Sequence, residues 1–163
     1  MRGGIGVLTG GLSEALIENC KTPLTKENFM FCRILCADIC GIEAHKVFVE
    51  ADVAGGLPAF NIVGLPSSEV RESKERVIRA ITNSGYDFPS RKITINLSPA
   101  SLRKIGSGFD LPIAISILCA IGQIPQSTIK DTLIIGELSL DGIVNPIKGI
   151  LPIAIMAQKE KVK

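Results

Sequence analysis

The stretch that decides the fold is residues 59–99, AFNIVGLPSSEVRESKERVIRAITNSGYDFPSRKITINLSP, because it holds a strand, a helix and a second strand. The first strand is predicted for residues 59–63. A helix is predicted for residues 67–83, since Pro66 followed by serine is typical of a helix start. Apolar and polar residues then alternate over residues 92–98. This alternation predicts a strand with one buried face.

The predicted helix is amphipathic. Its apolar side chains fall on one stripe at helical spacing, formed by Val70, Val77, Ile78 and Ile81. Two pairs of opposite charge, four residues apart, are oriented to stabilise it: Glu72 with Arg76, and Glu75 with Arg79. A charged run of this kind is typical of a solvated helix face, and a binding surface is the alternative. Gly85 is a natural end for this helix.

Two further strands are predicted ahead of this stretch, over residues 33–39 and 45–53. The first overlaps FCRILCADIC, in which three of the five cysteines are spaced by four: Cys32, Cys36 and Cys40. The only histidine, His45, lies close by. These residue types allow a metal site, but the spacing matches neither C-x-x-C nor a zinc finger. Free cysteines commonly act as small buried hydrophobic residues, which is the simpler interpretation.

After the central stretch, the loop ASLRKIGSG leads into an apolar run, FDLPIAISILCAIG, which predicts a buried helix from about Asp110. Asp110 itself is placed to cap this helix. A strand is predicted for residues 132–140, followed by a turn at residues 141–142 and a return strand from Ile143. A final helix is predicted from about Ile150. The order βββαβαββα predicts an α/β fold in the broad sense. More narrowly, it predicts an α+β arrangement with a mixed sheet.

The length of 163 residues fits one domain preceded by a leader, which we assign to residues 1–29 because they show no clear period. Hydrophobic residues make up 46% of the chain, but Gly, Pro and charges interrupt every apolar run before it reaches the length of a bilayer span. The segment GGIGVLTGGL is too short and too rich in glycine for a signal peptide. A cytoplasmic protein without a membrane partner is therefore expected.

Charge and composition also bear on function. The net charge of +2 is too small to argue for nucleic-acid binding, and aromatic residues form only 4% of the chain, which disfavours base-stacking platforms. The sequence contains no G-x-x-x-x-G-K-[ST] loop. Because a P-loop nucleotide site needs that backbone cradle and lysine, we do not expect this chain to hydrolyse ATP.

Three stretches carry a specific family resemblance: CGIEAHKVFVEADV, the long segment that includes GLPAFNIVGLP and RKIGSGFDLPIA, and IIGELSLDGIVNPIKGILP. They resemble the N-terminal domain of the ComM/YifB group of magnesium-chelatase-related AAA+ ATPases. The match covers residues 30–163 and leaves residues 1–29 outside it. The resemblance implies a Lon-protease-like fold for residues 30–163, with the AAA+ ATPase module absent from this chain.

The Lon resemblance also identifies two positions of a catalytic dyad. Lon proteases use a serine and a lysine, and these positions fall on Gly108 and Leu151, so neither dyad member is present. An aliphatic side chain cannot accept the proton of a nucleophile. Ser107 and Lys148 lie close to the two positions, and Lys104 is another nearby base. A Ser-Lys peptidase that uses Ser107 is the least favoured interpretation.

The resemblance implies a non-catalytic accessory domain of a AAA+ ATPase that supports ring assembly and DNA processing, including natural transformation and branch migration. Its expected partners are a C-terminal AAA+ module and further copies of the protein. No cofactor or metal is expected in this chain, whereas the ATPase module would use ATP and magnesium. The alternative is a module that contacts DNA itself. Its candidate phosphate contacts are Arg71, Lys74, Arg76, Arg79, Arg91, Lys92, Arg103 and Lys104.

Overall fold

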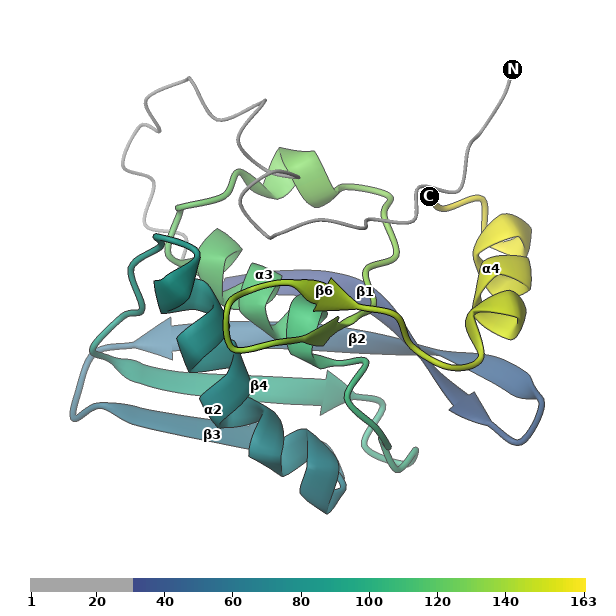
Figure 1. Cartoon of the computed structure of the whole chain (residues 1–163), viewed down its shortest axis with the longest axis horizontal. Coiled ribbons are helices and arrows are strands. Elements are labelled where there is room, and N and C mark those ends of the chain that lie inside the picture. The colour runs from purple at the N-terminus through teal and green to yellow at the C-terminus, as the bar shows by residue number, and fades with distance from the viewer. Residues whose placement is uncertain (1–30) are drawn as a thin grey trace.

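The structure, a computed structural model, describes residues 31–163 (Figure 1). The predicted leader, residues 1–29, lies outside the described residues. In chain order the elements are β1 (Phe31–Cys40), β2 (Glu43–Ala54), β3 (Ala59–Val63), α2 (Ser68–Asn83), β4 (Lys92–Ser98), α3 (Asp110–Ala120), the 3-10 helix η1 (Gln126–Ile129), β5 (Glu137–Leu138), β6 (Val144–Asn145) and α4 (Ile150–Lys159). Apart from η1, this is the predicted order.

The four longer strands form one mixed sheet, in the order β1-β2-β4-β3. β2 pairs antiparallel with both β1 and β4, whereas β3 runs parallel to β4. The parallel pair needs a crossover connection, and α2 provides it. The predicted mixed sheet is therefore confirmed, and β5 and β6 form a separate small hairpin.

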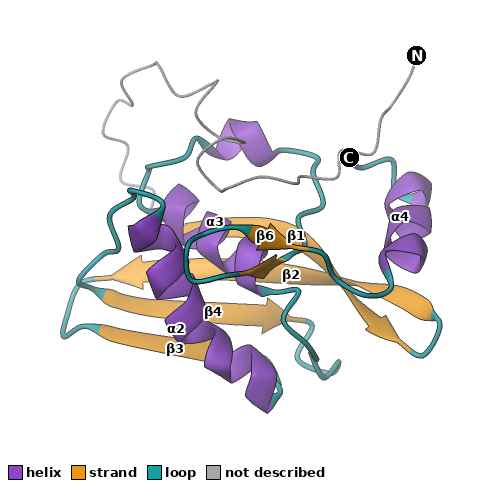
Figure 2. Cartoon of the chain, viewed as in Figure 1, coloured by secondary structure: helices purple, strands orange, loops and turns teal. Residues whose placement is uncertain are grey.

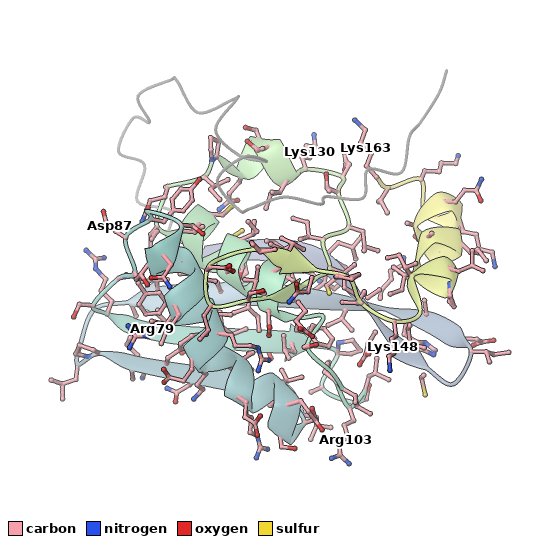
Figure 3. The ribbon with its side chains drawn as sticks, in the orientation of Figure 1. Arg79, Asp87, Arg103, Lys130, Lys148 and Lys163 are labelled. Atoms are coloured by element: carbon pink, nitrogen blue, oxygen red, sulfur yellow. The ribbon has the colours of Figure 1, made fainter. Side chains whose placement is uncertain are left out.

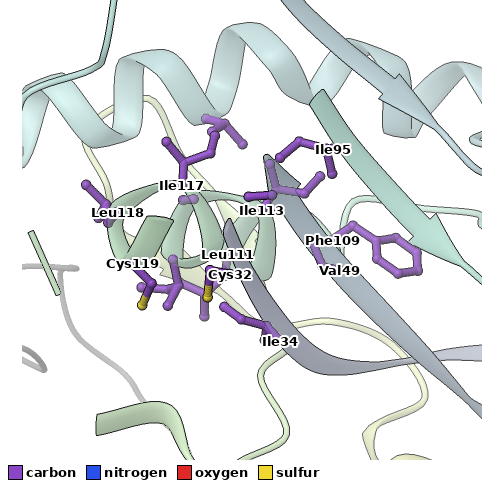
Figure 4. Close-up of a cluster of buried hydrophobic side chains, with 14 of the residues drawn as sticks. Cys32, Ile34, Val49, Ile95, Phe109, Leu111, Ile113, Ile117, Leu118 and Cys119 are labelled. Carbon is purple, nitrogen blue, oxygen red and sulfur yellow. The ribbon is translucent and has the colours of Figure 1, made fainter. Parts of the chain in front are cut away.

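Helices α2 and α3 cover one face of the sheet (Figure 2). Alternate residues of β4, namely Ile93, Ile95 and Leu97, are buried on this face, as the alternation predicted. Every residue of α3 is buried, and Figure 4 shows how its apolar side chains meet those of the strands. Burial of one Ile, Leu or Val side chain stabilises a fold by about 1.5–3 kcal/mol. This apolar layer is therefore the main source of stability.

Helix α4 packs against β1 and β2 on the opposite face. Lys46 forms a salt bridge with Glu160 just beyond the helix, with Nζ 2.6 Å from Oε2. Lys46 alternates with the fully buried Val47, so the two side chains point to opposite faces of β2. Ile39 lies beside Gly149, the residue that precedes α4. The β1–β2 pair is thus enclosed by helices from both sides.

The ends of α2 follow the sequence signals. Ser67 is the N-cap, and its Oγ accepts the Val70 N–H at 3.4 Å. The start of α3 differs from the prediction, because Asp110 does not cap this helix. Its carboxylate instead accepts hydrogen bonds from Arg76 of α2. A guanidinium that donates two hydrogen bonds is a stronger partner for a buried carboxylate than a single backbone N–H.

The strand predicted for residues 132–140 was largely wrong, since only Glu137 and Leu138 form one. The residues before β5 send their backbone hydrogen bonds to separate segments. The Leu133 N–H donates to the Lys163 carbonyl at 2.7 Å, and the Ile134 N–H donates to Leu35 at 2.9 Å. An apolar run that packs on several segments has the composition of a strand without a single partner strand.

None of the helices within residues 31–163 is both long enough and apolar enough to cross a bilayer.

Candidate functional site

Lys104 lies in the loop between β4 and α3 and is completely buried. Its Nζ donates to the carbonyl of Gly64, at 2.9 Å, and to the carbonyl of Pro99. Its backbone also bonds to the turn before α2, because the Lys104 N–H donates to Leu65 and its carbonyl accepts the Ser67 N–H. Lys104 therefore joins two loops. Lys104, one of the predicted phosphate contacts, is therefore enclosed by the protein in this structure.

Asp38, at the end of β1, is the charged neighbour of Lys104. Its carboxylate accepts the N–H of Ile105 at 3.1 Å and that of Ile39 at 2.8 Å. Burial raises the pKa of Asp38, and these two hydrogen bonds oppose that shift. Burial lowers the pKa of Lys104, and the Asp38 carboxylate opposes it. The two groups hold the loop that leads to Ser107 against the sheet.

Ser107 donates a hydrogen bond from its Oγ to Oε2 of Glu137 on β5. Asn145 of β6 completes the group, with its Nδ2 3.4 Å from Glu137 Oε1 and 3.0 Å from Ser139 Oγ. The neighbouring backbone is also paired, because the Gly136 N–H donates to the Gly108 carbonyl at 2.9 Å. The serine nearest to the expected nucleophile position is thus bonded to a carboxylate, and not to a lysine.

The two positions that the Lon resemblance assigns to a dyad have different surroundings. A Cβ added at Gly108 would lie 3.3 Å from the Ile135 side chain, so this turn is closely packed. Leu151 lies in the first turn of α4 and is 68% exposed. Lys148, labelled in Figure 3, is an exposed residue of the loop before α4. The Lys104 ammonium already donates to two carbonyls, so it is not placed to accept a proton from Ser107.

Arg76 and Asp110 form a further polar contact between α2 and α3. Arg76 Nε lies 2.7 Å from Asp110 Oδ2, which also accepts the Leu138 N–H at 3.3 Å. Burial raises the pKa of Asp110, and the Arg76 guanidinium opposes that shift. The hydrogen bond to Asp110 in turn raises the pKa of Arg76. Arg76 was predicted to pair with Glu72 and to contact DNA, but its guanidinium is committed to this buried carboxylate.

The remaining basic candidates do not form one patch. Lys74 is half-buried, with its Nζ 5.9 Å from the centre of the Phe60 ring. The others are exposed: Arg71, Arg79, Arg91, Lys92 and Arg103. Arg91 and Lys92 lie at the N-terminal end of β4, whereas Arg103 follows its C-terminal end. Since β4 spans about 20 Å at 3.3 Å per residue, Arg103 is well separated from Arg91 and Lys92.

The cysteines are distributed as structural residues. Cys32, Cys36 and Cys119 are buried and Cys40 is exposed, while Cys20 lies outside the described residues. On a strand, a spacing of four places cysteines about 13 Å apart along one face, too far for one metal ion. No group of three metal-ligating side chains, His45 included, occurs among residues 31–163. Burial raises the pKa of Cys36, as expected for an inert thiol.

Glu137 and Asn145 are the polar residues of this region that sequence reasoning did not select. Ser107 and Glu137 are 30 residues apart, so their contact depends on how the β5–β6 hairpin sits against the start of α3. No local sequence signal predicts that placement.

The fold is a mixed-sheet α/β domain, and its site consists of two loops joined through Lys104 and a polar cluster at Ser107. Residues 49–163 match the family described as "Subunit ChlI of Mg-chelatase". The chain belongs to this magnesium-chelatase-related family.

Several curated proteins are similar to most of this chain. The chain is 41% identical over 121 residues to "Competence protein ComM" of Haemophilus influenzae, covering 74% of this chain and 24% of the relative. It is 43% identical over 119 residues to "Uncharacterized protein YifB" of Escherichia coli, covering 73% and 24%. An uncharacterised Mycobacterium tuberculosis protein is 42% identical over 120 residues, covering 74% and 24%. The chain thus spans about a quarter of the length of the curated relatives it matches.

Proposed function

We propose that this chain is a non-catalytic accessory domain of a AAA+ ATPase, and that it supports ring assembly and DNA processing by the full-length protein. The observation that carries the proposal is the family match over residues 49–163, combined with relatives about four times as long as the matched region. The chain itself contains no P-loop. ATP and magnesium would therefore be bound by a separate AAA+ module, which is the first partner of this domain.

The geometry around Ser107 supports a role without catalysis. A Ser-Lys dyad needs a lysine that accepts the serine proton. Lys104 is held by the carbonyls of Gly64 and Pro99, and Ser107 donates to Glu137. The two Lon positions read Gly108 and Leu151. On this proposal, the Lon-like loop has become a structural connection between the sheet and α3.

The proposed DNA-processing role rests on one relative that is named as a competence protein. Competence is the uptake of DNA by cells, so that name connects the relative with DNA. Transfer of this role to the present chain is by analogy of family.

Light scattering and ATPase assays test the proposal. We expect this chain to hydrolyse neither ATP nor peptides, and the full-length protein to hydrolyse ATP and form a ring when ATP and magnesium are added. Deletion of residues 31–163 from the full-length protein should weaken the ring. A full-length protein that stays monomeric with ATP, or a ring unaffected by the deletion, would refute the assembly role.

Direct DNA contact is the second candidate, favoured by the exposure of Arg71 and Arg79 on one helix. A labelled single strand should then be retarded in a gel at low salt, with affinity falling as salt rises. The variants Arg71→Gln and Arg79→Gln should reduce the salt dependence. Replacement of the buried Lys104 should not reduce it in a folded protein. Binding that is unchanged in both arginine variants would rule out this surface.

A further inference from the structure

β3 forms the outer border of the sheet, and no other strand among residues 31–163 pairs with its free edge. The Ala59 N–H donates to the Arg91 carbonyl, so the backbone groups of residues 59, 61 and 63 face β4. Successive backbone groups of a strand point in opposite directions. The N–H and carbonyl groups of Phe60 and Ile62 therefore point outward, away from the sheet. They can pair with one more strand.

An apolar hollow of about 370 Å³ lies at the N-terminal end of β3. Its walls include Pro58, Phe60, Phe88, Pro89 and Arg91. The rings of Phe60 and Phe88 contact each other with their centroids 5.9 Å apart. A strand paired with β3 would place alternate side chains on this side of the sheet. The hollow can hold one apolar side chain of such a strand.

The flank of α2 above β3 is basic. Arg71, Lys74, Glu75 and Ile78 are spaced by three or four residues and so lie on one side of the helix, with two positive charges and one negative charge. This side of the helix faces β3, because the Lys74 Nζ lies over the ring of Phe60. Together with Arg91 in the hollow, these side chains give the surroundings of the free edge a net positive charge. A second copy paired edge to edge would bring like charges together, whereas an acidic partner would be attracted.

The free edge is short but open. Pro58 precedes it and Pro66 follows it, so a partner strand can pair with about five residues, or roughly 17 Å. Within β3 there is neither proline nor a charged side chain, the usual protections of an edge strand.

We propose that the outer edge of β3 binds an extended acidic peptide segment of a partner protein by adding it as a fifth strand. The peptide backbone bonds to Phe60 and Ile62. An apolar side chain fills the hollow beside Phe88, and a carboxylate lies near Lys74 or Arg91. This inference is independent of the proposed ATPase partnership, since any protein with such a segment can supply it.

Fluorescence anisotropy with three labelled peptides on the 163-residue chain tests the proposal. The first peptide is EVFVEV, the second has alternate backbone nitrogens methylated, and the third is KVFVKV. We expect EVFVEV to bind and to slow amide exchange at Phe60 and Ile62 in NMR spectra. The methylated peptide should bind at least tenfold more weakly, because it cannot form the ladder. KVFVKV should bind at least about threefold more weakly, as expected from the loss of exposed charge pairs.

Charge-reversed variants provide a second readout. Lys74→Glu and Arg91→Glu should reverse the preference, so that KVFVKV binds more tightly than EVFVEV, whereas the matched control Lys130→Glu should change neither affinity. Circular dichroism confirms that each variant is folded. The peptide comparison on the unmodified chain stands even where a variant fails this check.

Four results would overturn the proposal. They are no saturable binding of EVFVEV, equal binding of the methylated peptide, NMR changes centred away from β3, and an unchanged preference in the folded charge-reversed variants. Displacement of EVFVEV by a 20-nucleotide thymidine strand would assign this edge to nucleic acid. Concentration-dependent dimers that protect the Phe60 and Ile62 amides would assign it to a second copy of the chain.

Discussion

Arg76 of α2 and Asp110 of α3 form a two-point ion pair, with Nε 2.7 Å from Oδ2 and Nη2 3.1 Å from Oδ1. Asp110 is fully buried, while 28% of the Arg76 side chain is exposed. The pair connects the helix that crosses from β3 to β4 with the central buried helix. Asp110 also accepts the Leu138 N–H, so three elements meet at one carboxylate.

The first prediction concerns this ion pair. Arg76→Ala should lower the free energy of unfolding by about 3 kcal/mol, because it leaves a buried carboxylate without its cation. Arg79→Ala, three residues further along the same helix and exposed, is the matched control and should change it by less than about 0.5 kcal/mol. Urea denaturation followed by circular dichroism measures both. Equal effects of the two substitutions would show that the contact contributes little.

The second prediction concerns the close approach of Gly64 to β4. A Cβ at Gly64 would lie 2.2 Å from the Leu97 carbonyl oxygen, and the residue has a φ of +93°. Gly64→Ala should therefore cost about 3 kcal/mol or more, through left-handed strain and a backbone clash. Gly85 has a φ of +83° but open space around it, so Gly85→Ala should cost about 1 kcal/mol. Thermal unfolding of both variants separates the clash from the strain.

The third prediction concerns Lys104. Lys104→Met keeps most of the aliphatic stem but removes the donors to two buried carbonyls, so we expect a loss of about 2 kcal/mol in stability. Lys148→Met, at an exposed lysine, should change stability by less than about 0.5 kcal/mol. Chemical denaturation at neutral pH measures this difference. A Lys104→Met variant as stable as the parent would mean that its hydrogen bonds add nothing.

The same residue gives a pH dependence. The pKa of Lys104 is lower in the folded protein than its ordinary value of 10.5, so the unfolded chain binds more protons in the range between the two values. The part of the stability that depends on this ionisation is fully present above pH 10.5 and is lost as the pH falls through the folded pKa, whereas the hydrogen bonds of the ammonium remain at neutral pH. The free energy of unfolding of the parent chain should therefore rise with pH, relative to that of the Lys104→Met variant. Parallel curves for the two proteins over that range would contradict this assignment.

The fourth prediction concerns Ser107. We expect a fluorophosphonate probe to leave it unlabelled in the folded chain, because its hydroxyl donates to Glu137 and no lysine is placed to activate it. Ser107→Ala should cost only about 1 kcal/mol, the value of one hydrogen bond. Mass spectrometry after treatment, beside an active serine hydrolase as positive control, reads out labelling. Stoichiometric modification of Ser107 would re-establish the peptidase interpretation.

Periodicity in the sequence predicted those elements whose patterns are local. The alternation of Ile93, Ile95 and Leu97 fixed which face of β4 is buried, and Ser67 marked the start of α2. Both patterns arise from geometry within a few residues, so one sequence is enough to reveal them. The apolar run at residues 132–140 misled for the same reason. Its composition is that of a strand, but its hydrogen-bond partners are distant in sequence.

The candidate site was less predictable, because its contacts join distant segments. In sequence, Lys104 stands in RKIGSG, which looks like an exposed basic loop. Its burial depends on Gly64, 40 residues earlier, and on the contact of its own loop with Asp38 of β1. The sequence around Arg76 likewise predicted a pair with Glu72 and contained no signal for its contact with Asp110, 34 residues later. The partners of these charged side chains are distant in sequence, so they can be identified only in the folded structure.

The position of each strand in the sheet determines how early it opens in local fluctuations. β2 has a neighbouring strand on each side, α3 against one face and α4 against the other, whereas β3 has one neighbouring strand and a free edge. The slowest amide exchange should therefore lie in β2, and the earliest exchange in β3. Fluctuations that loosen the sheet would begin at the edge that is open to a peptide. A bound strand there would slow the first step by which the domain comes apart.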